Sequence, residues 1–251
     1  MNHNLLILGG TTEASQLARA VAAIGINATL SYAGRVERPR PQPIAHRTGG
    51  FGGIAGLEAY LRNNSITHVV DATHPFAAQM SGHAVAACSA SGVPLIALTR
   101  PAWQPHAADD WRHVPDIAGA VDALTGPMCR VLLAIGRQNL ESFVAHPQHH
   151  YVLRLVDPPA EPPPLPSHTI IVSRGPFSLT GDTALMRKHG IDVVVAKNAG
   201  GSGASAKLEA ARNLHIPIVM IARPELPPRS EVYSVDAVLQ WLGHAGADLG
   251  V

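Results

Sequence analysis

Short apolar runs rich in Val, Ile and Leu alternate along the chain with segments of helical periodicity. The runs predict strands at residues 5–8, 28–32, 68–71, 95–98, 130–134, 151–155, 169–172, 192–196 and 218–221. Helical spacing of apolar positions predicts helices at residues 13–24, 76–90, 138–145, 179–188, 204–214 and 235–242. Strands that are apolar throughout and separated by helices are typical of a parallel sheet covered on both faces. The pattern therefore predicts an α/β fold with doubly wound topology.

Several motifs recur about 125 residues further along the chain. Residues 6–10 (LILGG) match 132–136 (LLAIG), 66–71 (ITHVVD) match 191–196 (IDVVVA), and 94–101 (PLIALTRP) match 217–224 (PIVMIARP). Phe51 and Phe177, each ahead of a helical segment, fit the same offset. Any two strand–helix–strand units look somewhat alike, but matches in the same order at a nearly constant offset favour a duplication. We expect two Rossmann-like parallel-sheet domains with helices on both faces, at residues 1–114 and 115–251.

Composition narrows the class of protein. The 251 residues are 46% hydrophobic and 15% charged, and 19 basic against 18 acidic residues give a net charge of +1, which argues against nucleic acid as a partner. Two cysteines without a Cys-x-x-Cys motif argue against a disulfide framework and a structural zinc site. There is no apolar run long enough to span a membrane and no export signal at the start, so we expect no membrane partner and a cytoplasmic location. None of these features indicates an oligomeric state.

The distinctive residues lie just after predicted strands, where open parallel sheets bind their ligands. The first such loop contains Gly9, Gly10, Thr11, Thr12 and Glu13 and opens the first predicted helix. Glycines allow a tight turn and close approach of a ligand, and the helix N-terminus offers free N–H groups to a phosphate. The complete G-x-G-x-x-G pattern is absent, so a glycine turn capped by threonine without any ligand is the alternative.

The segment after the second predicted strand is basic. Ser31 ends the strand, and four arginines with one glutamate follow: Arg35, Arg38, Arg40, Arg47 and Glu37. Four positive charges minus one give a local charge of +3, which suits the 2′-phosphate of NADPH better than the free ribose hydroxyl of NADH. We expect Arg35 to bind the phosphate. The prolines in this stretch make a solvated loop the alternative for the more distant arginines.

The second half carries cations near strand ends and around a glycine loop. They are Arg137, Arg154, Arg174, Lys197 and Lys207, with the loop at residues 200–203. This arrangement predicts a clamp on carboxylates or phosphate and thus an anionic substrate, the alternative being a mobile linker with solvated lysines. His146, His149 and His150 lie in a Pro-containing connection without acidic partners. We expect a solvated loop there and no metal site.

Four motifs in this order resemble the precorrin-6A reductase family. They are residues 7–14 (ILGGTTEA), 70–77 (VDATHPFA), 100–103 (RPAW), and 197–198 (KN) with the glycine loop up to Lys207. The resemblance implies two Rossmann-like domains with a cleft between them. It also implies NADPH-dependent reduction of one macrocycle double bond, which converts precorrin-6A to precorrin-6B in cobalamin biosynthesis. A related enzyme of the anaerobic pathway acts on the cobalt-containing substrate, and this alternative stays open.

The resemblance also implies site residues. For the cofactor they are Gly9, Gly10, Thr11, Thr12, Glu13, Ser31, Arg35, Thr73, His74 and Pro75. For the carboxylate arms and the apolar floor of a tetrapyrrole they are Arg137, Arg154, Arg174, Lys197, Asn198, Gly203 and Lys207, with Phe76, Trp103 and Phe177. His74 is the candidate proton donor or orienting group, although Pro75 directly after it is equally typical of a helix entry. The other hypotheses are an NADPH reductase of a different anionic, conjugated substrate and a nucleotide-binding sensor without turnover.

Overall fold

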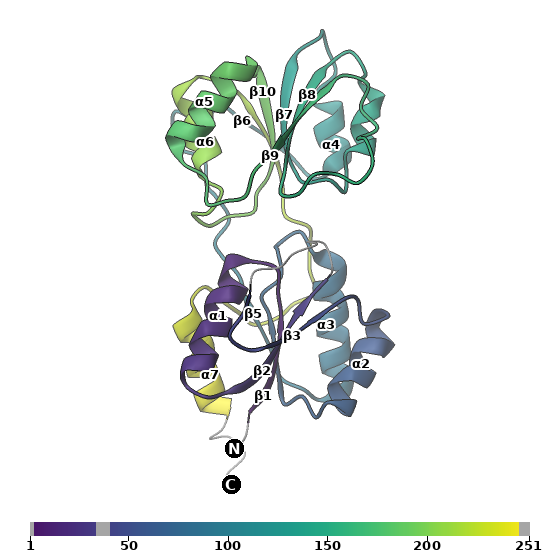
Figure 1. The fold of residues 1–251 in the computed structure, drawn as a ribbon, viewed down its shortest axis with the longest axis vertical. Helices are drawn as coiled ribbons and strands as arrows, with labels where there is room; N and C mark the ends of the chain where they lie inside the picture. Colours follow the sequence, from purple (N-terminus) through teal and green to yellow (C-terminus); the bar gives the residue numbers. More distant parts are fainter. Residues whose placement is uncertain (1–2, 34–40, 246–251) are drawn as a thin grey trace. The chain divides into compact units, whose positions relative to one another are not determined.

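The computed structural model describes residues 3–33 and 41–245, which form two six-stranded parallel sheets (Figure 1). The first sheet has the order β12-β5-β4-β1-β2-β3. Its strands are β1 (Asn4–Leu8), β2 (Asn27–Tyr32), β3 (Ala45–Thr48), β4 (His68–Asp71), β5 (Leu95–Leu98) and β12 (Glu231–Val232). The helices of this unit are α1 (Thr12–Ala23), α2 (Gly53–Asn63), α3 (Ala78–Ser91) and α7 (Val235–Ala245).

The second sheet has the order β6-β11-β10-β7-β8-β9. Its strands are β6 (Trp111–Val114), β7 (Arg130–Ala134), β8 (His150–Leu155), β9 (His168–Val172), β10 (Val193–Lys197) and β11 (Ile218–Ile221). The helices of this unit are α4 (Ile117–Asp122), α5 (Leu179–His189), α6 (Ala206–Asn213) and the 3₁₀ helix η1 (Glu141–Ala145). Every strand pair in both sheets is parallel, which confirms the predicted fold class.

The two sheets have one topology. In each, the first strand of the repeat (β1 or β7) lies at the centre, the next two lie on one side, and the following two lie on the other. The recurring motifs occupy equivalent strands, namely β1 and β7, β4 and β10, and β5 and β11. Helices α2 and α5 both begin and end 126 residues apart, because 179 − 53 and 189 − 63 give the same offset. The duplication predicted from the sequence is therefore confirmed.

The sixth strand of each sheet comes from the other half of the chain. β6 follows β5 in sequence but pairs with β11, and β12 follows β11 but pairs with β5. The compact units are consequently residues up to Pro101 together with those from Glu225, and Ala102–Pro224. The predicted division at residues 114 and 115 is wrong. The sequences of β6 and β12 lack the apolar pattern that predicts a strand, and nothing in them indicates which of two similar sheets they join.

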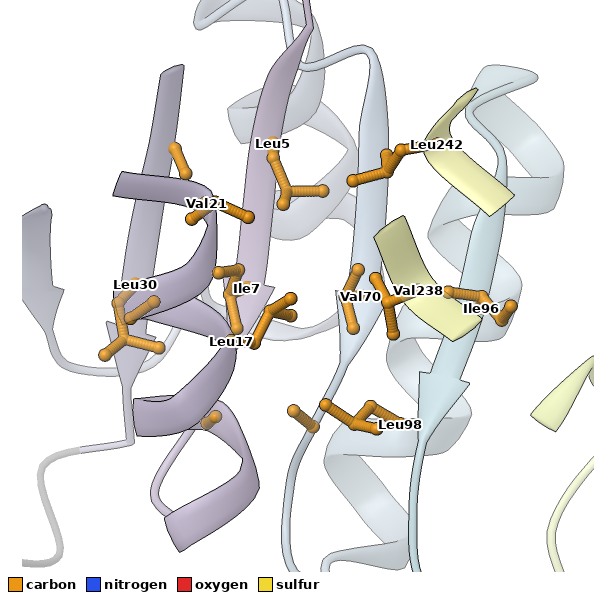
Figure 2. Close-up of a cluster of buried hydrophobic side chains, with 14 residues drawn as sticks. Leu5, Ile7, Leu17, Val21, Leu30, Val70, Ile96, Leu98, Val238 and Leu242 are labelled. Carbon is orange, nitrogen blue, oxygen red and sulfur yellow. The ribbon is translucent and has the colours of Figure 1, made fainter. Parts of the chain in front are cut away.

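The core of the first unit follows from the alternation of side chains along its strands. Leu5 and Ile7 of β1 point to the face covered by α1 and α7, where they pack with Leu17, Val238 and other apolar side chains (Figure 2). Their neighbours on β1 point to the opposite face, toward α2 and α3. Side chains alternate along a strand with a period of two, so one apolar strand supplies both layers. Each fully buried aliphatic side chain contributes roughly 1.5–3 kcal/mol.

The apolar pattern missed the weaker elements. Strands β3, β6 and β12 and helix α4 are absent from the sequence prediction, and α2 was indicated only as a helical segment after Phe51. The 3₁₀ helix η1 covers only the second part of the helix predicted at residues 138–145. The missed strands lie at sheet edges, where one side is open and polar residues are tolerated. β3, for example, has the sequence AHRT. Central strands are apolar on both faces and were therefore recognised.

Candidate functional site

The strand order of the first sheet reverses between β1 and β4. In open α/β sheets, ligands bind beyond the carboxyl ends of the strands at this switch point. The loop after β1 and the loop after β4 meet here, because the Thr11 hydroxyl donates a hydrogen bond of 2.7 Å to the Ala72 carbonyl oxygen. The sequence-predicted cofactor loops are therefore neighbours in space.

The two glycines of the first loop differ in what they avoid: Gly9 avoids a neighbouring side chain, and Gly10 has a backbone conformation that favours glycine. A Cβ on Gly9 would lie 2.5 Å from Cδ1 of Leu30 on β2. Gly10 has a φ of 116°, which L side chains rarely adopt. Thr11 then caps α1, because its side-chain oxygen accepts a hydrogen bond of 3.1 Å from the Ala14 N–H. With Ala14 N–H capped by Thr11, the N–H groups of Thr12 and Glu13 are those at the start of α1 that have no acceptor within the helix, so they suit a phosphate.

Glu13, in the first turn of α1, is ion-paired rather than free. Nη1 of Arg100, in the loop after β5, lies 2.7 Å from Oε2 of Glu13. An unpaired carboxylate at this helix N-terminus would repel an incoming phosphate. The ion pair removes that repulsion and connects the loops after β1 and β5.

The loop after β4 is shaped by Asp71, whose side chain is buried. One carboxylate oxygen accepts hydrogen bonds from the Thr73 N–H (3.1 Å) and hydroxyl (2.7 Å). The other accepts from the Ser81 hydroxyl at 2.6 Å and pairs with the Arg229 guanidinium. Sequence reasoning missed Asp71 and Arg229 as site residues. The aspartate that opens the 71–77 motif was a usable signal, whereas nothing in the sequence pairs it with a residue 158 positions away.

The Asp71 contacts position the residues that follow. The Nδ1 atom of His74 accepts a hydrogen bond of 3.2 Å from the Phe76 N–H. In the neutral imidazole the proton is therefore on Nε2, which is then the donor atom of the ring. Pro75 is buried and α3 begins three residues later, so the helix-entry and donor functions of this loop are compatible.

The basic segment after β2 is described only in part. Arg35 lies outside the described residues, as do Arg38 and Arg40. Ser31, at the end of β2, is buried and accepts a hydrogen bond of 2.7 Å from Nη1 of Arg47 on β3. The parallel pairing of β2 with β3 places Ser31 directly opposite Arg47, which explains the contact across 16 residues.

In the second unit, Arg154 of β8 is buried and neutralised. It forms an ion pair with Asp182 in the first turn of α5, and its guanidinium lies 4.0 Å from the centre of the Phe177 ring. The second carboxylate oxygen of Asp182 is buried and has no hydrogen-bond partner among the described residues. The structure thus places this predicted substrate-binding arginine inside the unit, with its charge already matched.

Trp103 organises the loop after β10. Its backbone N–H donates to Oδ1 of Asn198 at 2.8 Å, and Nδ2 of Asn198 donates to the Trp103 carbonyl at 3.0 Å. The indole N–H donates to the Gly201 carbonyl at 2.8 Å. Nζ of the buried Lys207 lies 4.6 Å from the indole ring centre and donates to the Ala204 carbonyl at 2.6 Å. Asn198 and Lys207 therefore hold the glycine loop in place.

The remaining predicted cations of the second unit are more accessible. Arg137 follows β7 and is exposed, and Lys197 ends β10, which pairs with β7. These two cations therefore lie at neighbouring strand ends. Arg174 is exposed two strands away and pairs with Asp157 at 2.5 Å. Gly203 is exposed in the loop after β10.

Within residues 3–33 and 41–245, no group of three metal-ligating side chains comes together, and no helix is long and apolar enough to cross a membrane. His149 is buried rather than solvated, contrary to expectation. Its Nδ1 accepts from the Cys129 N–H at 3.2 Å, and its Nε2 lies 2.8 Å from the Leu124 carbonyl oxygen.

Two sheets in the 3-2-1-4-5-6 order, one with a glycine turn and a helix N-terminus at its switch point, define a protein of the Rossmann-like fold class. The chain matches the family model described as precorrin-6x reductase CbiJ/CobK over residues 4–243. It belongs to this family, which makes it an oxidoreductase of cobalamin biosynthesis. The resemblance seen in the sequence motifs is confirmed.

The relatives share nearly the whole chain. The precorrin-6A reductase of Rhodobacter capsulatus is 55% identical over 97% of both chains, and that of Mycobacterium tuberculosis is 40% identical over 93% of both. The cobalt-precorrin-6A reductase of Priestia megaterium is 27% identical over 88% of this chain and 91% of the relative. A solved structure of CobK precorrin-6A reductase matches with a TM-score of 0.94 and 55% identity over 97% of both chains.

Proposed function

We propose that this protein reduces one double bond of the precorrin-6A macrocycle with NADPH, giving precorrin-6B. The observation that carries the proposal is the family match across residues 4–243, with relatives named precorrin-6A reductase at 40–55% identity. Relatives named cobalt-precorrin-6A reductase are 27–30% identical. This difference favours the metal-free substrate over the cobalt-containing one.

The first unit binds the cofactor in this proposal. Gly9 and Gly10 leave room for the pyrophosphate, and the N-terminus of α1 with its Thr11 cap, Thr12 and the Arg100-neutralised Glu13 provides N–H groups for it. Thr73, His74 and Pro75 lie in the adjacent loop, on the nicotinamide side. Ser31 lies at the ribose side, where Arg35 remains a candidate. NADPH supplies a hydride when bound, and the protein positions it.

The second unit binds the anionic macrocycle. Arg137, Arg174 and Lys197 are the accessible cations for its carboxylate arms. Asn198 and Lys207 hold the loop that contains Gly203, and Trp103 is the apolar surface within it. Arg154 is buried beneath Phe177 and supports that ring. Cations arranged around aromatic surfaces match a flat, conjugated polycarboxylate.

His74 is the proposed proton donor or orienting group. The Phe76 N–H occupies Nδ1, so Nε2 of His74 is the atom that can hold or release a proton at the ligand. Reduction of a double bond consumes one hydride and one proton. We expect His74→Gln, which keeps a hydrogen-bond donor but cannot release a proton at neutral pH, to lower kcat more than it raises the KM for NADPH.

The test follows NADPH oxidation by purified protein supplied with precorrin-6A. We expect NADPH absorbance to fall and the product mass to rise by two hydrogen atoms, one of which is deuterium when the cofactor is labelled at the transferable position. Unchanged NADPH with precorrin-6A, but oxidation with the cobalt-containing form, would assign the protein to the alternative substrate. Unchanged NADPH with both would overturn the proposal.

A pair of variants tests the two binding regions separately. Arg137→Ala removes an accessible cation of the second unit and is expected to raise the KM for the macrocycle about tenfold without changing that for NADPH. Arg187→Ala in the last turn of α5 is the matched control. This exposed arginine lies at the C-terminal end of a helix, whereas Arg137 lies just after the carboxyl end of a strand. Equal effects of the two substitutions would remove Arg137 from the substrate site.

A further inference from the structure

We infer that Arg47 and Ser31 form the subsite that recognises the 2′-phosphate of the cofactor. The inference rests on the proposed NADPH dependence and adds the residues that distinguish NADPH from NADH. It differs from the sequence expectation, which favoured Arg35 and treated Arg47 as part of a solvated loop. Four features of the described residues support it.

The first is position. Ser31 lies at the carboxyl end of β2, where Rossmann proteins bind the ribose 2′ position. Its carbonyl oxygen accepts a hydrogen bond of 2.9 Å from the Gly9 N–H, which joins it to the glycine loop. Because β2 pairs with β3 in parallel, Arg47 lies directly opposite Ser31 at the same sheet edge. One edge thus carries the pyrophosphate loop, a hydroxyl and a guanidinium in succession.

The second is a fixed orientation. Besides the Ser31 hydroxyl, the Arg47 guanidinium donates to the carbonyls of Gly49 (2.9 Å) and Gly50 (3.0 Å). It also stacks on Phe51 at 4.0 Å from the ring centre and lies 5.2 Å from the ring centre of Tyr60. A guanidinium already held in place loses little rotamer entropy when it binds a ligand.

The third is unused donor capacity. A guanidinium has five N–H groups, and the three hydrogen bonds above leave Nε–H and one Nη2–H without a partner among the described residues. The Ser31 hydroxyl accepts from Arg47 and retains its own proton for donation. These donors match the oxygens of a phosphate monoester.

The fourth is unbalanced charge. Every group that accepts a hydrogen bond from Arg47 in the described part of the chain is neutral, and none of the described ion pairs includes it. In the second unit, by contrast, the guanidinium stacked on the equivalent phenylalanine, Phe177, is neutralised by Asp182. The position equivalent to Asp182, 126 residues earlier, is Gly56. The described part of this unit therefore supplies no anion to the half-buried Arg47.

Glycine at position 56 is itself enforced. A Cβ there would lie 1.8 Å from the Phe51 carbonyl oxygen, so no aspartate fits without displacing the backbone. The same packing that brings Phe51 under Arg47 thus excludes a carboxylate at position 56. The geometry leaves the positive charge for the ligand.

Arg47→Gln and Ser31→Ala test the inference. Loss of a charge-assisted contact predicts a rise of about 10- to 100-fold in the KM for NADPH with Arg47→Gln and about threefold with Ser31→Ala, while the KM for NADH changes less than about twofold. Arg47→Lys restores part of the NADPH preference. Arg62→Gln, an exposed arginine of α2 whose charge only pairs with Glu58, is the control and should behave as wild type.

Binding of adenosine 2′,5′-bisphosphate against adenosine 5′-monophosphate, measured by calorimetry, gives a readout independent of turnover. Wild type is expected to prefer the bisphosphate, and Arg47→Gln to lose that preference while it remains folded. Equal losses for both nucleotides, or for NADPH and NADH, would make Arg47 structural and overturn the inference. A protein that binds the bisphosphate through Arg47 but does not reduce precorrin-6A would overturn the proposed function and leave this inference standing.

Discussion

Arg47 of the first unit and Arg154 of the second are both stacked on a phenylalanine ring, but they differ in the groups that surround their positive charge. Each guanidinium lies 4.0 Å from the ring centre of a phenylalanine that precedes a helix, and these phenylalanines are equivalent in the repeat. Arg154 is buried and paired with Asp182, whereas Arg47 is half-buried and, among residues 3–33 and 41–245, donates hydrogen bonds to neutral groups alone. One copy of the repeat thus neutralises the stacked arginine with an internal ion pair, and we propose that the other copy uses it to bind a ligand.

Each unit does contain a buried Arg–Asp pair, but at a different place. In the first unit the pair is Asp71 with Arg229, beneath the Thr73–His74 loop. In the second it is Arg154 with Asp182, beneath Phe177. A buried pair fixes the groups around it, because removal of one partner leaves an uncompensated charge. The position of the pair therefore indicates which segment is held rigid.

The largest expected effect is a loss of folding stability when the buried Arg154–Asp182 pair is broken. Asp182→Ala leaves Arg154 buried without a counter-charge, and we expect a loss of about 3–5 kcal/mol in the free energy of unfolding, measured in urea. Asp157→Ala, which breaks the more exposed pair with Arg174, should cost no more than about 1 kcal/mol. The double variant Arg154→Met/Asp182→Leu should recover most of the loss. A small effect of Asp182→Ala would mean that Arg154 is solvated.

The second effect concerns the pair under the cofactor loop. Arg229→Met should cost about 2–3 kcal/mol, less than Asp182→Ala, because Asp71 keeps three other hydrogen-bond donors. Because Thr73 donates two hydrogen bonds to the same Asp71 carboxylate, we also expect a lower kcat/KM with NADPH. Asp182→Ala, assayed where it remains folded, should leave the KM for NADPH unchanged. If both variants weaken NADPH binding equally, the Asp71–Arg229 pair does not position the cofactor loop specifically.

The third-largest expected effect concerns Gly56, which occupies the position equivalent to Asp182. Gly56→Ala forces a methyl group against the Phe51 carbonyl oxygen, and we expect a loss of about 1–3 kcal/mol in unfolding free energy. Gly243→Ala, in α7 with open space around it, is the matched helical control and should be neutral or stabilising by up to about 1 kcal/mol. Stabilisation by Gly56→Ala would contradict the close approach of α2 to Phe51.

The smallest expected effect is a dependence of folding stability on pH, to which one histidine in each unit contributes. Burial lowers the pKa of His68 in the first unit, with a contribution from His3, and burial with Arg130 lowers the pKa of His150 in the second. The unfolded chain therefore binds protons first as pH falls below about 6.5, and stability declines by at most about 1.4 kcal/mol per pH unit for each histidine. Urea unfolding of His68→Gln and His150→Gln should show shallower slopes. Unchanged slopes would show that His68 and His150 do not cause the pH dependence of stability.

The sequence predicted the parts of the molecule that repeat or bury apolar surface. Central strands were recognised because both faces are covered, and the loops after β1 and β4 were assigned because chain order and strand direction bring them to one edge. Arg47 was undervalued because its contact with Ser31 depends on β3, an edge strand with a polar sequence. Arg229 was missed because its partner is 158 residues away.

The sequence by itself determined the fold class, the duplication and the family, because periodicity, spacing and motif order are properties of the chain. Only the tertiary structure decided which sheet each sixth strand joins, since β6 and β12 pair with the opposite repeat through backbone hydrogen bonds that leave no side-chain signature. It also decided which arginine is neutralised. The sequence gives the sign of each charge, whereas the neutralisation of a charge depends on its distance from an opposite charge and on the burial that packing imposes.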